Sequence, residues 1–89
     1  MTPDIDAVWA RIKAHEGDTF RQIRGGEFTY TVIGASLQLD RTNQGIPRTH
    51  IAQALDLVPL ENTTPVQHLR APSYVYAILM DPRIRMGEW

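Results

Sequence analysis

The fold is decided by residues 19–39, which read TFRQIRGGEFTYTVIGASLQL. Two turns, Gly25-Gly26 and Gly34-Ala35, divide this stretch into three short segments rich in β-branched and aromatic residues. Glycine suits the two-residue turns that join antiparallel strands, because those turns need positive φ angles. The stretch therefore predicts a meander of three antiparallel strands.

The register of the meander follows from its two turns. The first turn places Ile23 opposite Phe28, and the second places Tyr30 opposite Leu39. Side chains alternate along a strand, so both registers put one apolar set on a single face of the sheet. That set is Ile23, Phe28, Tyr30, Val32, Leu37 and Leu39.

The same register places two arginines at the margins of the apolar face. Arg21 would lie beside Tyr30, and Arg41 would lie beside Phe28. An arginine stem covers apolar surface while its guanidinium reaches water. Two interpretations stay open, namely simple coverage of the core and a charged rim around it.

An amphipathic helix is predicted ahead of the meander, over residues 3–15. Thr2 would cap it, Pro3 suits the first helical position, and Gly17 supplies a left-handed stop. Its apolar side chains recur at the spacing of one helical stripe, which must face a core. They are Ile5, Val8, Trp9 and Ile12.

Further helices are predicted after the meander. One runs from residue 47 or 48 to residue 57, a short one covers residues 64–67, and the last covers residues 72–80. The last is apolar almost all round, as expected for a central core helix, and Pro82 must end it near Asp81. We expect Ile84 to anchor the segment that follows while its arginines face outward, and Trp89 to dock back on the body.

Length and composition predict a single domain over residues 1–89, of the α+β class. It has an N-terminal helix, a three-stranded antiparallel meander and then two to three helices packed on one sheet face. Apolar residues make up 43% of the 89 residues and charged residues 21%, which is typical of a soluble globular protein. There is no cysteine, signal-peptide pattern or long apolar run, so we expect a cytoplasmic protein that does not enter a membrane.

Sequence motifs of catalysis and of cofactor binding are absent. His15, His50 and His68 lack the HxxxH or HExxH spacing that would place two metal ligands on one helix face. No phosphate-binding loop or nucleophile elbow occurs. We therefore expect a protein that is not an enzyme and uses no metal or cofactor.

The candidate binding site lies in the polar stretch 40–53, which reads DRTNQGIPRTHIAQ. Eight of the nine basic residues of the chain are arginine, which suits bidentate contact with phosphate or guanine. A net charge of −1 argues against a strongly basic, non-specific nucleic-acid binder. Arg48 beside free helix amides could bind phosphate, or Thr49 and the loop could merely cap the helix. The candidate nucleic-acid-binding residues are Arg41, Asn43, Gln44, Arg48, Thr49 and His50, with Arg83 and Arg85.

Several short motifs resemble a known type of domain. They are Phe28-Thr29-Tyr30-Thr31-Val32, Asp40-Arg41, Ile46-Pro47-Arg48, Ala54-Leu55, residues 72–79 and Asp81-Pro82-Arg83-Ile84. Together they resemble the N-terminal head-type domain of bacterial McrA-type modified-DNA-dependent restriction endonucleases, and they are similar to short stand-alone bacterial proteins of unknown function. In such enzymes the nuclease is a separate HNH domain. The resemblance therefore implies an accessory module that contacts DNA without cleaving it.

Two hypotheses about function stay open. The first is a non-catalytic accessory or recognition module that binds DNA and is linked to restriction or defence. The alternative is a protein-interaction or homodimerisation module that uses the edge strand 19–23 or the tail 83–89, since apolar anchors dominate such interfaces. The sequence indicates neither the ligand nor the oligomeric state, nor whether the arginine-bearing segments form one surface, nor whether the chain is part of a larger protein.

Overall fold

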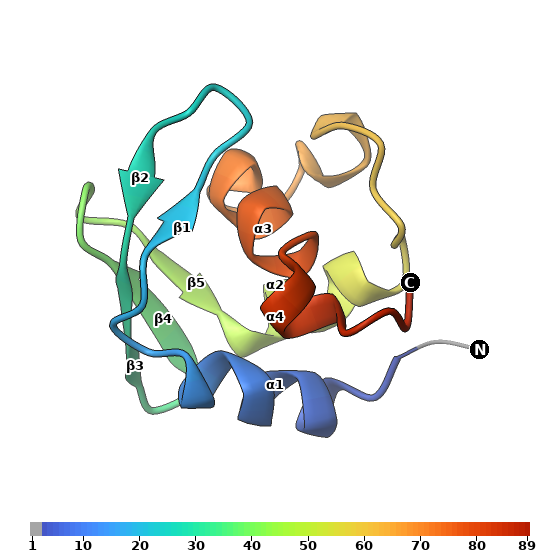
Figure 1. Cartoon of the computed structure of the whole chain (residues 1–89), viewed down its shortest axis with the longest axis horizontal. Coiled ribbons are helices and arrows are strands. Elements are labelled where there is room, and N and C mark those ends of the chain that lie inside the picture. The colour runs from blue at the N-terminus through green and yellow to red at the C-terminus, as the bar shows by residue number, and fades with distance from the viewer. Residues whose placement is uncertain (1–2) are drawn as a thin grey trace.

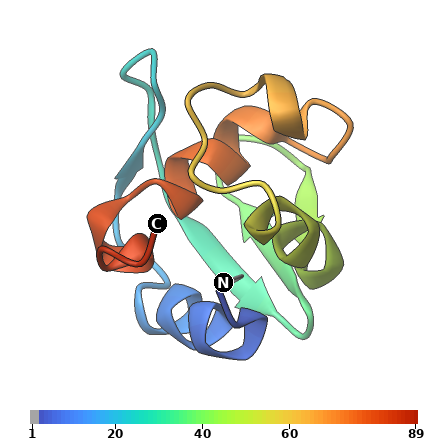
Figure 2. The same ribbon diagram turned by 90° about the vertical axis from the view of Figure 1, so that its right-hand side faces the viewer.

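The computed structural model describes residues 3–89 and places its four α-helices on one face of antiparallel strands (Figure 1). Figure 2 shows the helices in front of the strands. The elements are α1 Ile5–Ala14, β1 Phe20–Arg21, β2 Glu27–Phe28, β3 Tyr30–Ile33, β4 Ser36–Leu39, β5 Gly45–Pro47, α2 Arg48–Leu55, the 3₁₀ helix η1 Thr64–Val66, α3 Pro72–Leu79 and α4 Pro82–Arg85. The predicted α+β class is confirmed.

The hairpin between β3 and β4 has the register that its turn predicts. Tyr30 pairs with Leu39, and Val32 pairs with Leu37. Gly34 has a φ of 58°, the left-handed backbone that this turn requires. As a result Tyr30, Leu37 and Leu39 are buried, as expected for the face that meets the helices.

The hairpin between β1 and β2 has a register different from the predicted one. Phe20 pairs with Phe28, and the turn is closed by a hydrogen bond of 2.8 Å from the Gln22 N–H to the Gly26 carbonyl. The prediction of a two-residue loop with Ile23 opposite Phe28 is therefore wrong. The turn is longer, and Ile23 belongs to it rather than to the strand.

The shifted register exchanges the two faces of β1, because side chains alternate along a strand. Phe20 is 1% exposed, and its ring centroid lies 6.0 Å from that of Phe28 and 5.2 Å from that of Tyr30. Ile23 is instead 62% exposed. Burying an aromatic ring here removes more apolar surface from water than burying Ile23 and Arg21 would, and it leaves the arginine in solvent.

The third strand of the main sheet lies where a loop was predicted. β5 pairs with β4 so that Ile46 lies opposite Leu37 and Pro47 opposite Ser36. The three-stranded sheet is therefore β3–β4–β5, and β1–β2 forms a separate two-stranded sheet. Only Thr29 separates β2 from β3, so one extended segment serves both sheets. A three-residue strand that contains proline shows no two-residue periodicity, which explains why it was missed.

Helix α1 begins slightly later than predicted. Its N-cap is Asp4, whose carboxylate accepts a hydrogen bond of 3.1 Å from the Asp6 N–H. Thr2, the predicted cap, lies outside the described residues. The apolar stripe is confirmed, with Val8, Trp9 and Ile12 buried and Ile5 half-buried.

The end of α1 is joined to the sheet through Tyr30. The Tyr30 hydroxyl donates a hydrogen bond of 2.6 Å to the Ile12 carbonyl, and the Tyr30 backbone carbonyl accepts one of 3.1 Å from the Gly17 N–H. The Glu16 carboxylate accepts a hydrogen bond from the Val32 N–H. These contacts cover the outer edge of β3, which would otherwise expose unpaired backbone groups.

The C-terminal half supplies most of the remaining core. α2 ends at Leu55, before the predicted residue 57, while η1 and α3 lie where they were expected. The short helix α4 was not predicted, but the anchoring role of Ile84 is confirmed by its complete burial. Trp89 does dock back, because its indole N–H donates a hydrogen bond of 2.8 Å to the Leu79 carbonyl.

The register of the first hairpin can be tested with two substitutions. Phe20→Ala empties a fully buried site and should lower the free energy of unfolding by about 3–5 kcal/mol. Ile23→Ala trims an exposed side chain and should change it by no more than about 0.5 kcal/mol. Urea denaturation measures both changes. A larger loss of unfolding free energy in Ile23→Ala than in Phe20→Ala would support the predicted two-residue loop instead.

The contribution of the Tyr30 hydroxyl can be isolated in the same way. Tyr30→Phe leaves the buried Ile12 carbonyl without this partner and should lower the free energy of unfolding by about 1–2 kcal/mol. Tyr76→Phe is the matched control, because Tyr76 is half-buried and its hydroxyl makes no hydrogen bond within residues 3–89. Equal stabilities of the two variants in urea denaturation would contradict the assigned role.

Candidate functional site

The eight predicted nucleic-acid-binding residues lie in three separate parts of the fold. Arg41, Asn43 and Gln44 lie on the connection between β4 and β5; Arg48, Thr49 and His50 form the first turn of α2; Arg83 and Arg85 lie on α4. β5 separates the first group from the second, because its Gly45 lies opposite Gln38 and its Pro47 lies opposite Ser36 at the far end of β4.

The connection between β4 and β5 is held mainly by backbone contacts. Arg41 donates a hydrogen bond of 3.3 Å to the Glu27 carbonyl and lies so close to Gly26 that a Cβ there would come within 2.5 Å of its guanidinium. The Asp40 N–H donates a hydrogen bond of 3.1 Å to the Thr29 carbonyl, which continues the predicted register toward Arg41 and Phe28, and the Arg41 side chain is exposed. The Gln44 carbonyl accepts a hydrogen bond from the Leu39 N–H, while the Asn43 side chain is exposed.

The predicted position of Arg21 beside Tyr30 is wrong. The shifted register turns Arg21 away from the core, and its guanidinium lies 3.6 Å from the Glu27 carboxylate. Both side chains are largely exposed, so this ion pair contributes little to stability. Neither of the two arginines forms a rim around the apolar face.

The first turn of α2 is tied to neighbouring helices and loops. Arg48 forms an ion pair with Asp6 of α1, and its guanidinium lies 5.8 Å from the centre of the Trp9 ring. His50 Nδ1 accepts a hydrogen bond of 3.1 Å from the Arg70 N–H. Thr49 is exposed, and the helix has no side-chain cap. Arg48 and His50 therefore both make structural contacts.

The prediction that both arginines of α4 face outward is wrong for Arg83. Its guanidinium makes two hydrogen bonds of 2.9 Å to the Asp81 carboxylate, donates one of 2.8 Å to the Thr19 carbonyl and lies 4.1 Å from the centre of the Phe20 ring. Asp81 also caps α4. Arg85 donates a hydrogen bond to the Trp89 carbonyl. Arg83 thus attaches α4 to the segment that leads into β1, and Arg85 holds the last residue against α4.

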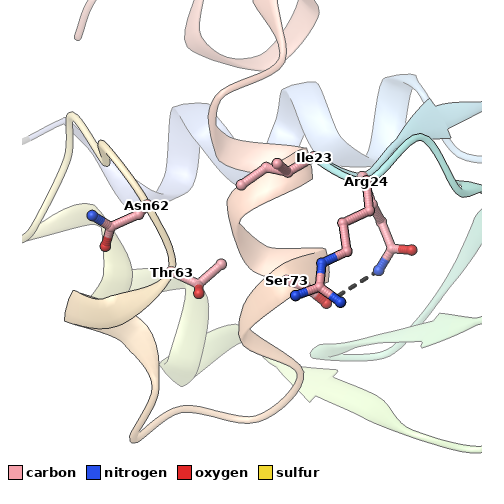
Figure 3. A pocket seen from close by; sticks show the side chains of 6 residues that line it. Ile23, Arg24, Asn62, Thr63 and Ser73 are labelled. Atoms are coloured by element: carbon pink, nitrogen blue, oxygen red, sulfur yellow. Dashed lines mark hydrogen bonds between the residues drawn. The ribbon is translucent and has the colours of Figure 1, made fainter.

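A hollow that the sequence did not predict lies beside the turn of the first hairpin (Figure 3). Its volume is about 480 Å³, and its lining comes from the hairpin, the segment before η1 and the start of α3. The Gln22 side chain donates a hydrogen bond of 3.1 Å to the Ser73 hydroxyl. Figure 3 shows Asn62 and Thr63 on one side of the hollow and Ile23 and Arg24 on the other.

A second hollow, of about 380 Å³, shares Gln22 and Ile23 with the first. Its other lining residues are Arg21, Tyr76, Ala77, Met80, Asp81, Pro82 and Arg85. Side chains three, four and seven positions apart share one face of a helix, so the two hollows follow one another along the face of α3 that carries Ser73, Tyr76, Ala77 and Met80. We call these hollows together the hairpin–helix groove.

The backbone edge of β1 opens on this groove. Gln22 bonds to β2 across the turn, so in an antiparallel ladder the backbone groups of Arg21 point away from β2, while Ile23 already belongs to the turn. Neither residue makes another backbone hydrogen bond within residues 3–89. The Thr19 carbonyl, farther along the same edge, is occupied by Arg83. The open part of the edge is therefore the part next to the groove.

The groove could have been found only in part from the sequence. Gly25 and Gly26 correctly indicate a turn, and α3 was correctly predicted as a helix that begins at Pro72. The register of β1 determines which residues of the turn face α3. That register was predicted wrongly because the loop is longer than two residues. Asn62 and Thr63 carried no signal, because they lie in a segment without periodicity.

Within the described part of the chain, His, Asp and Glu side chains nowhere gather in groups of three or more that could hold a metal ion. In residues 3–89 no helix has the length and apolar character needed to cross a bilayer. No family model matches the sequence, and searches of the curated proteins and of the solved structures return no significant match. The resemblance to the restriction-endonuclease head domain stays a prediction.

The contact between Asp81 and Arg83 makes stability dependent on pH. The Arg83 hydrogen bonds hold the pKa of Asp81 below its ordinary value, despite some opposing desolvation. A lowered pKa stabilises the fold above the unfolded-state pKa of about 3.9, and this stabilisation is lost as the pH falls through the folded-state value. Asp81→Asn should therefore cost about 1–2 kcal/mol of unfolding free energy at neutral pH and progressively less in acid.

Urea denaturation at several pH values between neutral and strongly acidic measures this difference. Asp56→Asn is the control, because Asp56 is exposed and its side chain makes no hydrogen bond within residues 3–89. A difference between Asp81→Asn and the wild type that does not change with pH would contradict the electrostatic origin of the effect.

Proposed function

We propose that the protein is a non-catalytic recognition module that binds an extended segment of a partner protein in the hairpin–helix groove. One observation carries the proposal, namely the unpaired outer edge of β1 at Arg21, followed by Ile23 in the turn, beside a groove with an apolar wall. An extended peptide can add to such an edge as a further strand, with main-chain hydrogen bonds supplying affinity and pockets for alternate side chains supplying specificity.

The side chains of the groove suit this mode of binding. Tyr76 and Met80 are half-buried, and Ile23 is largely exposed and lines both hollows. A peptide bound in the groove would therefore bury apolar surface of Ile23 on one wall and of Tyr76 and Met80 on the other. Tyrosine and methionine are enriched at protein interfaces. The polar residues at the Ser73 end offer hydrogen bonds to a ligand.

The lining residues also favour binding over chemistry. Ser73 accepts its hydrogen bond from the Gln22 amide, which is not a base, and the groove lining contains no histidine. The acid in the lining, Asp81, is engaged by Arg83. A serine without an adjacent base is a weak nucleophile.

DNA binding and its link to restriction stay a prediction from the sequence. Arg48 and Arg83 would have to give up the carboxylates of Asp6 and Asp81 before they could bind phosphate. The remaining candidates lie on other parts of the fold, and the chain carries no net positive charge. For these reasons the alternative, a protein-interaction module, has the stronger physical support.

Selection of peptides from a random-sequence display library tests the proposal, followed by fluorescence anisotropy of the selected peptides. We expect binding in roughly the micromolar range, typical of short peptides that pay a large ordering cost. Ile23→Ser should weaken it by about five- to tenfold, because apolar contact is lost in the groove. Amide signals of Arg21 and Ile23 should shift in NMR spectra on binding.

Ile33→Ser is the matched control, since Ile33 and Ile23 are 61% and 62% exposed but only Ile23 lines the groove. Equal effects of the two substitutions would reject the groove as the binding site. Saturable binding of labelled duplex DNA that weakens with salt and in Arg48→Ala would support the DNA hypothesis instead. Sedimentation over a concentration series tests pairing between two copies of the chain.

A further inference from the structure

We infer that the partner segment is acidic, with an apolar residue flanked two positions away on each side by aspartate or glutamate. This inference rests on the proposed function, since it names the chemistry of the peptide that the hairpin–helix groove would bind. It follows from where the charged groups lie along the groove and from the length of the groove.

The walls of the groove are positively charged although the whole chain is nearly neutral. Arg24 lines the first hollow, and Arg21 and Arg85 line the second. The acid that lines it, Asp81, is already bonded to Arg83. Three of the nine basic residues of the chain therefore line this groove, and one acidic residue does. Such a local field attracts acidic partners and sets their orientation.

Arg24 is the arginine best placed to recognise a ligand. It forms no ion pair and no side-chain hydrogen bond within residues 3–89, unlike Arg21, Arg48 and Arg83. A guanidinium presents a planar fork that matches a carboxylate in a bidentate pair. Because Arg24 has no carboxylate to give up, a ligand carboxylate would gain this pair without breaking another one.

The length of the groove sets the spacing of the acidic residues. The α3 face from Ser73 to the C-cap Met80 spans seven residue steps, which corresponds to roughly 10 Å along the helix axis. An extended chain advances about 3.3 Å per residue and turns every second side chain to the same side. Residues two positions before and after a central one span about 13 Å and face the same wall. Long arginine side chains cover the remaining distance.

The central position would carry the apolar side chain. The middle of the groove is formed by Ile23, Tyr76 and Ala77, with Arg24 at the Ser73 end and Arg85 at the Pro82 end. An apolar residue there buries surface against these side chains, while the flanking carboxylates reach the two arginine ends. Charge at the ends and apolar contact at the centre together define the sequence pattern.

A peptide fits the groove better than a single-stranded nucleic acid does. The open edge of β1 presents both an N–H donor and a C=O acceptor at Arg21. A peptide backbone complements both kinds of group, whereas a phosphodiester backbone offers only acceptors. Few arginines line the groove, so the release of counterions would contribute only modestly to nucleic-acid affinity.

Three labelled peptides of one design test the inference by fluorescence anisotropy: Asp-Thr-Leu-Thr-Asp, Asn-Thr-Leu-Thr-Asn and Lys-Thr-Leu-Thr-Lys, each with neutral flanks and blocked ends. The acidic peptide should bind about tenfold more tightly than the neutral one, and the basic peptide more weakly still. Raising the salt concentration to about 0.5 M should remove most of this preference, because salt screens exposed charges.

Two arginine variants provide the matched pair. Arg24→Gln should weaken binding of the acidic peptide by about fivefold and leave the neutral peptide unchanged. Arg70→Gln should change neither, because the Arg70 side chain also lacks an ion pair within residues 3–89 but does not line the groove. Equal effects of the two variants would overturn the inference.

The remaining outcomes separate this inference from the proposed function. If all three peptides bind equally and Ile23→Ser weakens all of them, the groove binds peptides but the acidic preference is refuted. If none binds and the NMR signals of Arg21 and Ile23 do not move, both proposals fail. If a single-stranded oligonucleotide binds instead, and Arg24→Gln abolishes that binding, the groove binds nucleic acid and the inference is overturned.

Discussion

The fold depends on the burial of Tyr30, which joins the sheet to the first helix. Its hydroxyl bonds to the Ile12 carbonyl, its backbone carbonyl accepts from Gly17, and its ring packs on Phe20. Burial raises the pKa of this phenol above its ordinary value, so the hydroxyl keeps its proton and acts as a donor. One residue therefore links the end of α1 to the start of β3, and the aromatic rings of β1 and β2 pack around it.

The hairpin–helix groove is a consequence of that packing. Tyr30 and Phe28 form an aromatic surface that favours a third ring from β1, and Phe20 supplies it. Once Phe20 faces inward, alternation along the strand turns Arg21 toward solvent and places Ile23 in the exposed turn. Arg21, Gln22 and Ile23 then line one hollow together with Tyr76, Ala77 and Met80, so the open strand edge lies close to a partly apolar face of α3.

The arginines divide into two classes according to their contacts. Arg48 and Arg83 link distant elements through carboxylates and aromatic rings, and Arg83 closes one end of the β1 edge by bonding to Thr19. Arg24 lies at the other end of the groove and has no such contact within residues 3–89. The sequence shows that a residue is arginine but not whether a carboxylate lies beside its guanidinium. Only that contact distinguishes Arg24 from Arg48 and Arg83.

Elements with a local signal could be predicted from the residues alone. The stripe of α1, the β3–β4 register set by Gly34, the core helix α3 and the anchors Ile84 and Trp89 follow from periodicity, turn chemistry and size. The register of β1, the strand β5, the contacts of the candidate arginines and the groove became visible only in the folded chain. The groove and the contacts of Arg48 and Arg83 join segments far apart in the sequence, so no local pattern reveals them. β1 and β5 pair with nearby strands, but their registers depend on side-chain packing: Phe20 rather than Ile23 is buried because Phe28 and Tyr30 present an aromatic surface to it.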